Sequence, residues 1–403
     1  MGYTTLKIAM SRRIIMAVTN DLATDQRADR SCRALKEAGY EVTLVGRRLR
    51  ESPDLEEREY RTVRMRMLFR RSALFYAEYN VRLLLRLLVM SADAFYANDS
   101  DTLLACCWAA RLRRRTSAGD KIRLLFDAHE LFPDVPELVD KPRVQSVWRW
   151  VERRCLPRVD AAFTVSQSVA DEYRQRYGVT MTVVRNLPER ANLEPNTSSP
   201  KTKSQIGPYV LLYQGAVNVG RGVRELIDVM RLLPECRLEV IGDGDLLEEL
   251  RTYTATLPWA NHIDLYGRML PKDLHKITSS MSLGVCLLED LGESYRCALP
   301  NRVGDFAQAG VPLLATGFVE IRRVLEEYGI GAVTEPCPTT KEGDEYEQYL
   351  ERLAATIMAT LHQWEEMPQE ERDRRFERAR RELCWEREKH LLTDAANASF
   401  SNE

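Results

Sequence analysis

Short apolar runs alternate with amphipathic stretches along most of the chain, which predicts strands that alternate with helices. The first strand is predicted at Ile14–Thr19, and the next helix, Gln26–Ala38, would end at Gly39. The remaining predicted strands are Glu41–Val45, Ala94–Ala97, Arg123–Phe126, Ala162–Val165, Tyr209–Tyr213, Arg237–Ile241, Ile263–Tyr266, Leu283–Leu287 and Pro312–Ala315. Alternation of this kind favours parallel sheets covered by helices on both faces.

Other segments refine this pattern. A helix is predicted at Arg143–Leu156, with its apolar positions assigned to the core: Val144, Val147, Trp148, Val151 and Cys155. Residues 188–208 contain four prolines and no periodic pattern, so they are interpreted as a linker. The last 50 residues are charged, helical in pattern and interrupted by Pro368. We therefore predict an α/β protein of two tandem Rossmann-like, doubly wound domains, 1–195 and 205–385, that face a central cleft.

Composition and charge narrow the class of protein. The chain has 403 residues, 44% hydrophobic and 29% charged, which excludes a wholly disordered or fibrous protein. The net charge is −2, but residues 1–190 carry +9 and the remainder −11. The nine cysteines include no CxxC pair and are interpreted as free thiols in a reducing compartment. No signal peptide or membrane-spanning run is apparent, so a cytoplasmic location is predicted.

A glycine-rich loop follows the first strand of the second domain. Residues 214–222 (QGAVNVGRG) lead into a helix near Val223, and their glycines would let the backbone approach a ligand. Arg221 adds a positive charge at the helix N-terminus. This arrangement fits a phosphate or diphosphate, although a turn with a solvated arginine gives the same pattern. The loop matches neither the dinucleotide fingerprint nor the P-loop, which disfavours nicotinamide cofactors and ATP hydrolysis.

Two further loops of the second domain follow predicted strands. The sequence Gly242–Asp245 (GDGD) fits a tight turn capped by Asp245, or a direct ligand contact. The sequence Leu299–Arg302 (LPNR) opens a helix that ends at Gly310. Arg302 and this helix N-terminus would form an anion site, and Asp305 would accept hydrogen bonds from vicinal hydroxyls. The alternative is a capped helix with surface charges.

Titratable groups are concentrated in one loop of the first domain. Residues 126–133 (FDAHELFP) follow a strand and place His129 beside Asp127 and Glu130, which indicates either a functional histidine or a structural one. Two Asp-x-Asp triplets, Asp99/Asp101 and Asp243/Asp245, are too short to predict a metal site. The basic residues lack a recognition motif, which disfavours nucleic-acid binding.

The segments above, taken in order, resemble a known family. From Val18 to about Trp385 the chain resembles a family-4 glycosyltransferase with the GT-B fold, of the type found in bacterial surface-polysaccharide pathways. The segments that carry the resemblance are DAHELFPDVPE (127–137), VERRCLPRVDAAFTVSQSVADEY (151–173), VVRNLP (183–188), YQGAVNVGRGVRELI (213–227), LEVIGDGDLLEEL (238–250) and ALPNRVGDFAQAGVPLLAT (298–316).

The resemblance implies a retaining transferase that moves a sugar from a nucleotide diphosphate sugar to an acceptor hydroxyl in cell-surface glycan assembly, such as that of lipopolysaccharide. His129 and Arg221 are expected to be catalytic, and the residues expected to bind the nucleotide and donor are Gly215, Gly222, Gly242, Gly267, Arg268, Asn301, Arg302 and Asp305. Asn20, Asp99 and Glu130 are expected on the acceptor side. A final helix at about 386–403 is expected to pack back on the first domain. No cofactor and no metal ion are expected.

The chain departs from the family pattern at defined positions. The family's glutamate pair falls at Cys297 and Asp305, and an arginine of the diphosphate loop falls at Ala216. Residues 19–24 (TNDLAT) replace a glycine-rich loop after the first strand. Sugar contacts of the first glutamate would then come from Glu289, Asp290 or backbone N–H groups.

The expected partners are a nucleotide sugar donor, a glycan or lipid-linked acceptor, and an anionic membrane surface. The stretches Arg61–Arg71 and Arg111–Arg115 interleave arginine with apolar residues, which predicts peripheral association at the inner face of the plasma membrane; a solvated arginine-rich surface is the alternative. Two other functions stay open at this point. One is a nucleotide-sugar epimerase on the same fold, and the other is a scaffold or binding protein with a decayed site.

Overall fold

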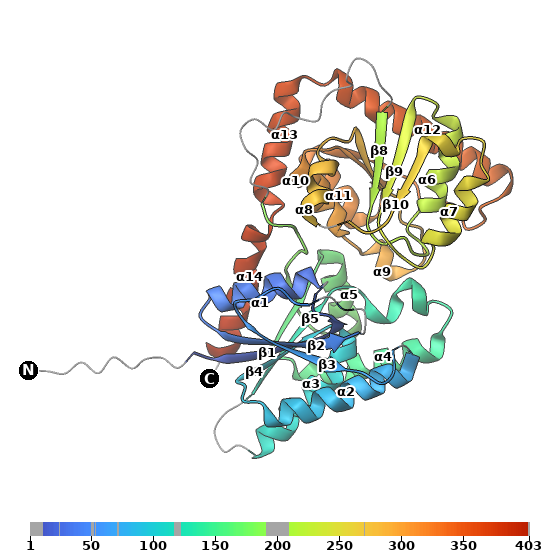
Figure 1. The fold of residues 1–403 in the computed structure, drawn as a ribbon. Helices are drawn as coiled ribbons and strands as arrows, with labels where there is room; N and C mark the ends of the chain where they lie inside the picture. The colour runs from blue at the N-terminus through green and yellow to red at the C-terminus, as the bar shows by residue number, and fades with distance from the viewer. Residues whose placement is uncertain are drawn as a thin grey trace, which may run out of the picture. The chain divides into compact units, whose positions relative to one another are not determined.

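The chain forms two compact units. The computed structural model describes residues 11–401 except 24, 50, 51, 53, 71, 117–121, 191–208 and 270. The front unit consists of Met1–Pro133, Asp140–Val184 and Lys389–Glu403, and the back unit consists of Asp134–Val139 and Arg185–Glu388 (Figure 1). Most of the predicted linker, 191–208, lies outside the described residues.

The front unit is built on a parallel sheet with the strand order β3-β2-β1-β4-β5-β6-β7. Its strands and helices are β1 (Arg13–Asp21), α1 (Gln26–Glu37), β2 (Glu41–Arg48), β3 (Arg61–Arg66), α2 (Ser72–Val89), β4 (Ala94–Asn98), α3 (Ser100–Thr116), β5 (Arg123–Ala128), α4 (Pro142–Cys155), β6 (Ala161–Thr164), α5 (Gln167–Tyr177), β7 (Thr182–Val183) and α14 (Trp385–Ser401), whose last turns belong to this unit. The strand order reverses between β1 and β4, and loops at the carboxyl ends of such strands are where ligands bind in open α/β sheets.

Helices cover both faces of the front sheet. Helices α2, α3 and α4 pack against one another along one face, while α1 and α14 lie on the other (Figure 1). Helix α14 is held to this unit by Tyr40, whose hydroxyl donates to Asn397 Oδ1 at 2.5 Å, and by the ion pair of Lys389 with Glu37 at 2.8 Å. The C-terminal helix therefore packs on the unit that contains the N-terminal strands.

One core assignment from the sequence is wrong. In α4 the side chains of Trp148, Val151 and Cys155 are buried, as predicted, but Val144 and Val147 are 40% and 56% exposed. Helix α3 packs against one side of α4, and among the described residues of the front unit nothing buries Val144 and Val147 on the other. Helical spacing of apolar residues thus identified the helix but assigned two of its surface positions to the core.

The back unit repeats the architecture, with the parallel strand order β10-β9-β8-β11-β12-β13. Its strands and helices are β8 (Tyr209–Gln214), α6 (Val223–Val229), β9 (Cys236–Ile241), α7 (Leu247–Ala255), β10 (Ile263–Tyr266), α8 (Pro271–Thr278), β11 (Leu283–Cys286), α9 (Glu293–Arg296), α10 (Asn301–Ala309), β12 (Leu313–Thr316), α11 (Val319–Tyr328), β13 (Gly331–Thr334), α12 (Gly343–Glu366) and α13 (Gln369–Glu382). Short 3₁₀ helices occur at Phe132–Asp134, Pro136–Leu138, Leu156–Arg158, Met230–Leu232 and Ala260–His262.

Alternating side chains of the central strand β8 pack into two hydrophobic clusters, one on each face of the back sheet. Leu211 and Tyr213 face a cluster completed by α6, α7 and α12, whereas Leu212 faces a cluster completed by α10, α11 and α13. Because a parallel strand is buried on both faces, its sequence is a continuous apolar run rather than an alternating one. That is why YVLLY was recognisable as a strand.

The structure confirms the predicted strands to within a few residues and adds three. The added strands β3, β7 and β13 lie at or near the sheet edges, where fewer apolar residues are needed. Helix α10 ends at Gly310, which has the left-handed φ of 75°, as predicted. The predicted cap at Asp245 is wrong, because α7 begins at Leu247 and no side chain caps it.

All nine cysteines are free thiols, which confirms the sequence interpretation of their state, and all but Cys337 are buried. Within the described ranges, no helix is long and apolar enough to cross a membrane.

Candidate active site

The loop after β8 carries glycines at positions that no other residue fits well. Gly215, Gly220 and Gly222 have φ values of 131°, 79° and 70°, in the region that L-residues avoid. A Cβ on Gly222 would lie 2.4 Å from the carbonyl oxygen of Leu287, just past β11. The loop therefore lies tightly across the point where the back sheet reverses its strand order.

The loop after β9 lies directly against it. A Cβ on Gly242 would lie 1.8 Å from the carbonyl oxygen of Gly215, and one on Gly244 would lie 2.4 Å from that of Val217. Beside these loops is an open cavity of about 620 Å³, lined by Gly215, Ala216, Asn218, Ile241, Gly242, Asp243, Gly244, Asp245, Arg268, Met269 and Leu274. Gly215, Gly242 and Arg268, which were predicted to bind the nucleotide, thus line one cavity.

Arg302 is a buried cation beside this cavity. It is 6% exposed, and its guanidinium lies 4.6 Å from the centre of the Tyr213 ring and donates to the Tyr213 hydroxyl at 3.4 Å. Its Nη1 has no hydrogen-bond partner, and no carboxylate of the described residues pairs with it. The other terminal nitrogen would lie 3.0 Å from a Cβ on Gly215, so the guanidinium adjoins the glycine loop. A buried charge without a counter-ion is costly, and a bound anion would remove that cost.

Arg221 supplies a second guanidinium in the same loop. It lies 4.9 Å from the centre of the Tyr295 ring, and its buried Nε also lacks a hydrogen-bond partner. Both arginines are near the buried Cys286 at the end of β11 and act to lower the pKa of its thiol, although burial raises that pKa overall. The back unit thus gathers two cations around one strand end.

The remaining predicted donor residues surround this region at different depths. Asp305, half-buried on α10, accepts a hydrogen bond from Gln214 Nε2 at 3.3 Å, just before the glycine loop. Asn301 is exposed at the first turn of α10, and Gly267 precedes the exposed Arg268 after β10. Asp305 is therefore attached to the loop, whereas Asn301 faces solvent.

The positions where the chain departs from the family pattern have defined surroundings. Glu289 pairs with Lys341 at 2.9 Å, and Asp290 pairs with Arg296 at 2.7 Å, so both suggested substitutes are engaged in ion pairs. The Sγ atom of Cys297 lies 3.8 Å from Glu293 Oε1, one helical turn earlier in the chain. A carboxylate therefore does stand next to position 297.

The front unit has a buried ion pair at its strand ends. Asp127, fully buried near the end of β5, accepts two hydrogen bonds from Arg27 Nη2, at 2.8 and 3.0 Å, and one from the Tyr96 hydroxyl at 3.0 Å. Arg27 also donates to the carbonyl oxygen of Val184 at 3.0 Å. This pair links α1, β4 and β5 beneath the loop that carries His129.

His129 lies between two carboxylates. Its backbone N–H donates to Asp99 Oδ1 at 2.8 Å, and its Nδ1 lies 3.2 Å from Asp99 Oδ2. Its Nε2 is 3.5 Å from Asp127 Oδ2, too long for a good hydrogen bond, and has no other partner. Asp99 achieves its two contacts with a left-handed φ of 57°, a conformation that aspartate tolerates better than most residues.

This environment fixes the charge of the cluster. Burial opposes protonation of His129, but Asp99 and Asp127 outweigh it and raise its pKa to about 9. Burial and the neighbouring Asp99 raise the pKa of Asp101 to about 8, while Thr19 donates to its carboxylate at 2.5 Å. Near neutral pH the cluster therefore holds an imidazolium between two carboxylates, with its Nε2 buried beside Asp127.

We expect the imidazole of His129 to titrate near pH 9 in an NMR pH series, since its pKa is raised to about 9. The ordinary pKa is 6.5, so the stability contributed by this charge is complete below pH 6.5 and is lost as the pH rises through about 9. Asp99→Asn should move the titration toward neutral pH. His275, whose pKa burial lowers, gives an opposite shift in the same spectra. A His129 midpoint below its ordinary value would contradict this assignment of charges.

The sequence predicted only part of the front cluster. It named His129 and Asp99, which lie together, and Glu130, which is half-buried and acts on the pKa of Asp101. Asn20 instead donates to Asp25, the N-cap of α1, at 3.0 Å. The sequence analysis missed Arg27. Its one signal was its position on the side of α1 whose other residues, such as Ala28 and Cys32, are buried.

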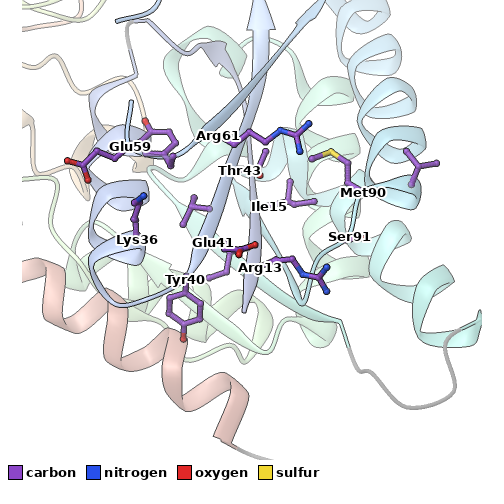
Figure 2. Close-up of a pocket in the computed structure, with 14 residues that line it drawn as sticks. Arg13, Ile15, Lys36, Tyr40, Glu41, Thr43, Glu59, Arg61, Met90 and Ser91 are labelled. Carbon is purple, nitrogen blue, oxygen red and sulfur yellow. The ribbon is translucent and has the colours of Figure 1, made fainter. Parts of the chain in front are cut away.

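A second cavity, of about 600 Å³, lies at the amino ends of the front strands, opposite the carboxyl ends that carry the His129 cluster. Figure 2 shows Arg13 beside Glu41, and Arg61 beside Thr43, on neighbouring strands. Because these are the amino ends of the strands, this cavity is separate from the His129 cluster. Across the described residues, no three His, Cys, Asp or Glu side chains are grouped to hold a metal ion.

Comparisons with known proteins bear on the family of the front unit and on the fold. Residues 26–187 match the family model described as Glycosyltransferase Family 4. No curated protein matches the sequence. The fold is similar to that of the lipopolysaccharide outer core galactosyltransferase WaaB (13% identity, 96% of this chain and 99% of that chain, TM-score 0.63). It is also similar to sucrose-phosphate synthase from Thermosynechococcus elongatus (16%, 97% and 100%, 0.73) and to Anabaena HepE in complex with UDP-glucose (13%, 96% and 100%, 0.68).

Proposed function

We propose that this chain, a glycosyltransferase of the GT-B fold whose residues 26–187 belong to glycosyltransferase family 4, is a retaining enzyme that transfers a sugar from a nucleoside diphosphate sugar to an acceptor hydroxyl. The observation that carries the proposal is Arg302, a buried guanidinium with an unpartnered Nη1 beside a glycine-rich loop. A diphosphate offers the anionic oxygens that this guanidinium lacks.

The chemistry assigned to the back unit is stabilisation of the leaving group. As the bond from the sugar to the diphosphate breaks, negative charge grows on the diphosphate oxygens. Arg302, Arg221 and the N-terminus of α10 are fixed positive groups that stabilise that charge where it forms. In this proposal the acceptor attacks from the face that the diphosphate leaves, so the enzyme needs no protein nucleophile and no metal ion.

The chemistry assigned to the front unit is positioning at the sugar and the acceptor. The imidazolium of His129, held between Asp99 and Asp127, would supply a fixed positive charge beside the sugar. Glu130 and Asp99 would line the acceptor side. In the back unit, Glu293 lies beside Cys297, the position of the missing glutamate, and pairs with Arg296 only at 3.4 Å; we assign it the donor-sugar contact.

The setting proposed for the reaction is assembly of a cell-surface glycan. Two proteins of similar fold are described as acting in lipopolysaccharide synthesis, the galactosyltransferase WaaB and the glycosyltransferase WaaG. The acceptor would then be a glycan or lipid-linked glycan, and the enzyme would work in the cytoplasm at the inner face of the plasma membrane.

The first test is thermal unfolding with UDP, GDP, ADP and CMP. We expect UDP to raise the midpoint by a few degrees, since a ligand at about 100 times its Kd stabilises by about 2.7 kcal/mol. UDP is the first choice because similar folds hold UDP-glucose and UDP-2-fluoroglucose. An unchanged midpoint with every nucleotide would contradict the proposal and favour a decayed scaffold.

A second test separates transfer from epimerisation. Supplied with a donor that shifts the midpoint, a transferase releases the nucleoside diphosphate faster when an acceptor is added, and EDTA leaves the rate unchanged. NMR of the product's anomeric proton should show the donor's anomeric configuration. An epimerised donor with no released nucleotide would instead support the epimerase.

A further inference from the structure

Helix α2 exposes apolar side chains along the side that faces away from the sheet. Leu74, Val81, Leu85 and Val89 recur at helical spacing and are 57–82% exposed. The opposite side of the helix buries Phe75, Tyr79, Leu83 and Leu87 against the front unit. A row of exposed apolar side chains of this length is normally covered, so the outer side of α2 is a candidate docking surface.

The exposed apolar surface continues over the two neighbouring helices. Helix α3 packs against α2 and α4, and the Tyr76 ring of α2 lies 5.1 Å from the Trp148 ring of α4. The outer sides of α3 and α4 expose Trp108, Leu112, Val144, Val147 and Trp150, each at least 36%. We call the outer side of these three helices the α2–α3–α4 face; Figure 1 shows α2 and α3 together on one side of the front sheet.

The same face is strongly cationic. Helices α2, α3 and α4 contain ten arginines and three acidic residues. Asp101 and Glu152 are buried, and Glu78 pairs with Arg82 at 2.7 Å. Exposed arginines, among them Arg86, Arg115, Arg143 and Arg154, therefore alternate with the apolar side chains without a matching number of surface carboxylates.

The structure also corrects which of the arginines identified from the sequence belong to the α2–α3–α4 face. Of the stretch Arg61–Arg71, residues 61–66 form the edge strand β3, where Arg64 pairs with Asp21 at 2.9 Å. In the stretch Arg111–Arg115, Arg113 donates to the carbonyl oxygen of Met90 and Arg114 pairs with Asp160. The basic stretches identified from the sequence overlap this face only in part.

We infer that the α2–α3–α4 face docks on an anionic lipid bilayer. Its apolar side chains would enter the boundary between headgroups and acyl chains, and its arginines would meet lipid phosphates with their charged ends. Tryptophans such as Trp108 and Trp150 are enriched at that depth, because their rings have both an apolar body and a polar N–H.

Charge argues against a second copy of the chain as the occupant. A two-fold dimer places the same surface of both copies together, so the excess of arginine would face an equal excess. An anionic bilayer supplies the opposite sign. The inference rests on the proposed function only for its biological use, the approach to a lipid-linked acceptor; docking itself needs neither donor nor acceptor.

The test is co-sedimentation of the full chain with lipid vesicles at low salt. We expect binding to phosphatidylcholine vesicles that contain roughly one third phosphatidylglycerol, and little binding to phosphatidylcholine alone. The variant Val81→Asp/Leu85→Asp should lower the partition coefficient by about tenfold or more. The variant Arg86→Gln/Arg115→Gln should lower it by about fivefold per charge removed.

Val319→Asp is the matched control. Val319 lies on α11 of the back unit and is 58% exposed, as is Val81, so it carries the same substitution at the same exposure. Its binding should equal that of the wild type, and each variant should keep the wild-type unfolding midpoint. Equal binding by Val81→Asp/Leu85→Asp and the wild type, or equal binding to neutral and anionic vesicles, would overturn the inference. The inference would also be overturned if the wild type did not bind vesicles but formed a dimer that Val81→Asp/Leu85→Asp dissociates. UDP stabilisation is measured separately, so its failure would count against the proposed function alone.

Discussion

Arg302→Met should abolish most nucleotide binding without weakening the ligand-free protein. Arg302 is buried and unpaired by any described carboxylate, so methionine of similar length removes an uncompensated charge and keeps the packing against Tyr213. We expect the free energy of unfolding of the ligand-free variant to stay level or rise. The affinity for UDP should fall by about 1.5–3 kcal/mol, or about 10- to 150-fold, the range for hydrogen bonds to a charged group. Isothermal titration and urea unfolding measure the two effects.

Arg185→Met is the matched control for Arg302→Met. Arg185 pairs with the buried Glu388 at 2.7 Å within the same unit, and its loss would leave that carboxylate without its cation. The control should therefore lose stability while its UDP affinity stays at the wild-type value. If Arg302→Met instead loses stability and binds UDP normally, Arg302 is a structural residue and the anion site must be reassigned.

Arg27→Met should strongly destabilise the front unit. It would leave Asp127, fully buried at the end of β5, without the guanidinium that contributes two hydrogen bonds from Nη2. Removing one partner of a buried ion pair typically costs about 3–5 kcal/mol. Urea unfolding followed by circular dichroism and tryptophan fluorescence measures the loss.

Arg33→Met on the same helix is the comparison for Arg27→Met. Arg33 pairs with Asp29 at the surface, where such pairs contribute about 0.3–0.5 kcal/mol. The double variant Arg27→Met/Asp127→Leu should recover much of the loss, because it removes the stranded carboxylate as well. Equal effects of Arg27→Met and Arg33→Met would show that the buried pair is not the source of stability that its geometry indicates.

The two arginine predictions have opposite signs for one physical reason. Arg27 is buried with its counter-ion, so the folded protein depends on it. Arg302 is buried without a described carboxylate, so the fold tolerates it at a cost, and that cost is relieved when an anion binds. The presence or absence of a counter-ion thus distinguishes the structural arginine, Arg27, from the proposed binding arginine, Arg302, although both are buried.

The sequence by itself determined the features that local pattern controls. Continuous apolar runs such as YVLLY marked the buried parallel strands, and Gly39 and Gly310 marked helix ends. Because doubly wound sheets bind ligands at the carboxyl ends of their strands, the loops after strands were the predicted sites, and they contain His129, Arg221 and Arg302. Edge strands such as β3 were not predicted, because an edge strand contains fewer apolar residues than a central one.

Only the tertiary structure decided which groups meet. Arg27 and Asp127 are 100 residues apart in the chain, and no local pattern links them. The charge of His129 depends on Asp99 and Asp127, which reach it from two different strand ends. The exposure of Val144 and Val147 likewise depends on what covers α4 rather than on the spacing of apolar residues within it. Local sequence sets conformation, but burial and electrostatics are properties of surroundings that the chain assembles from distant segments.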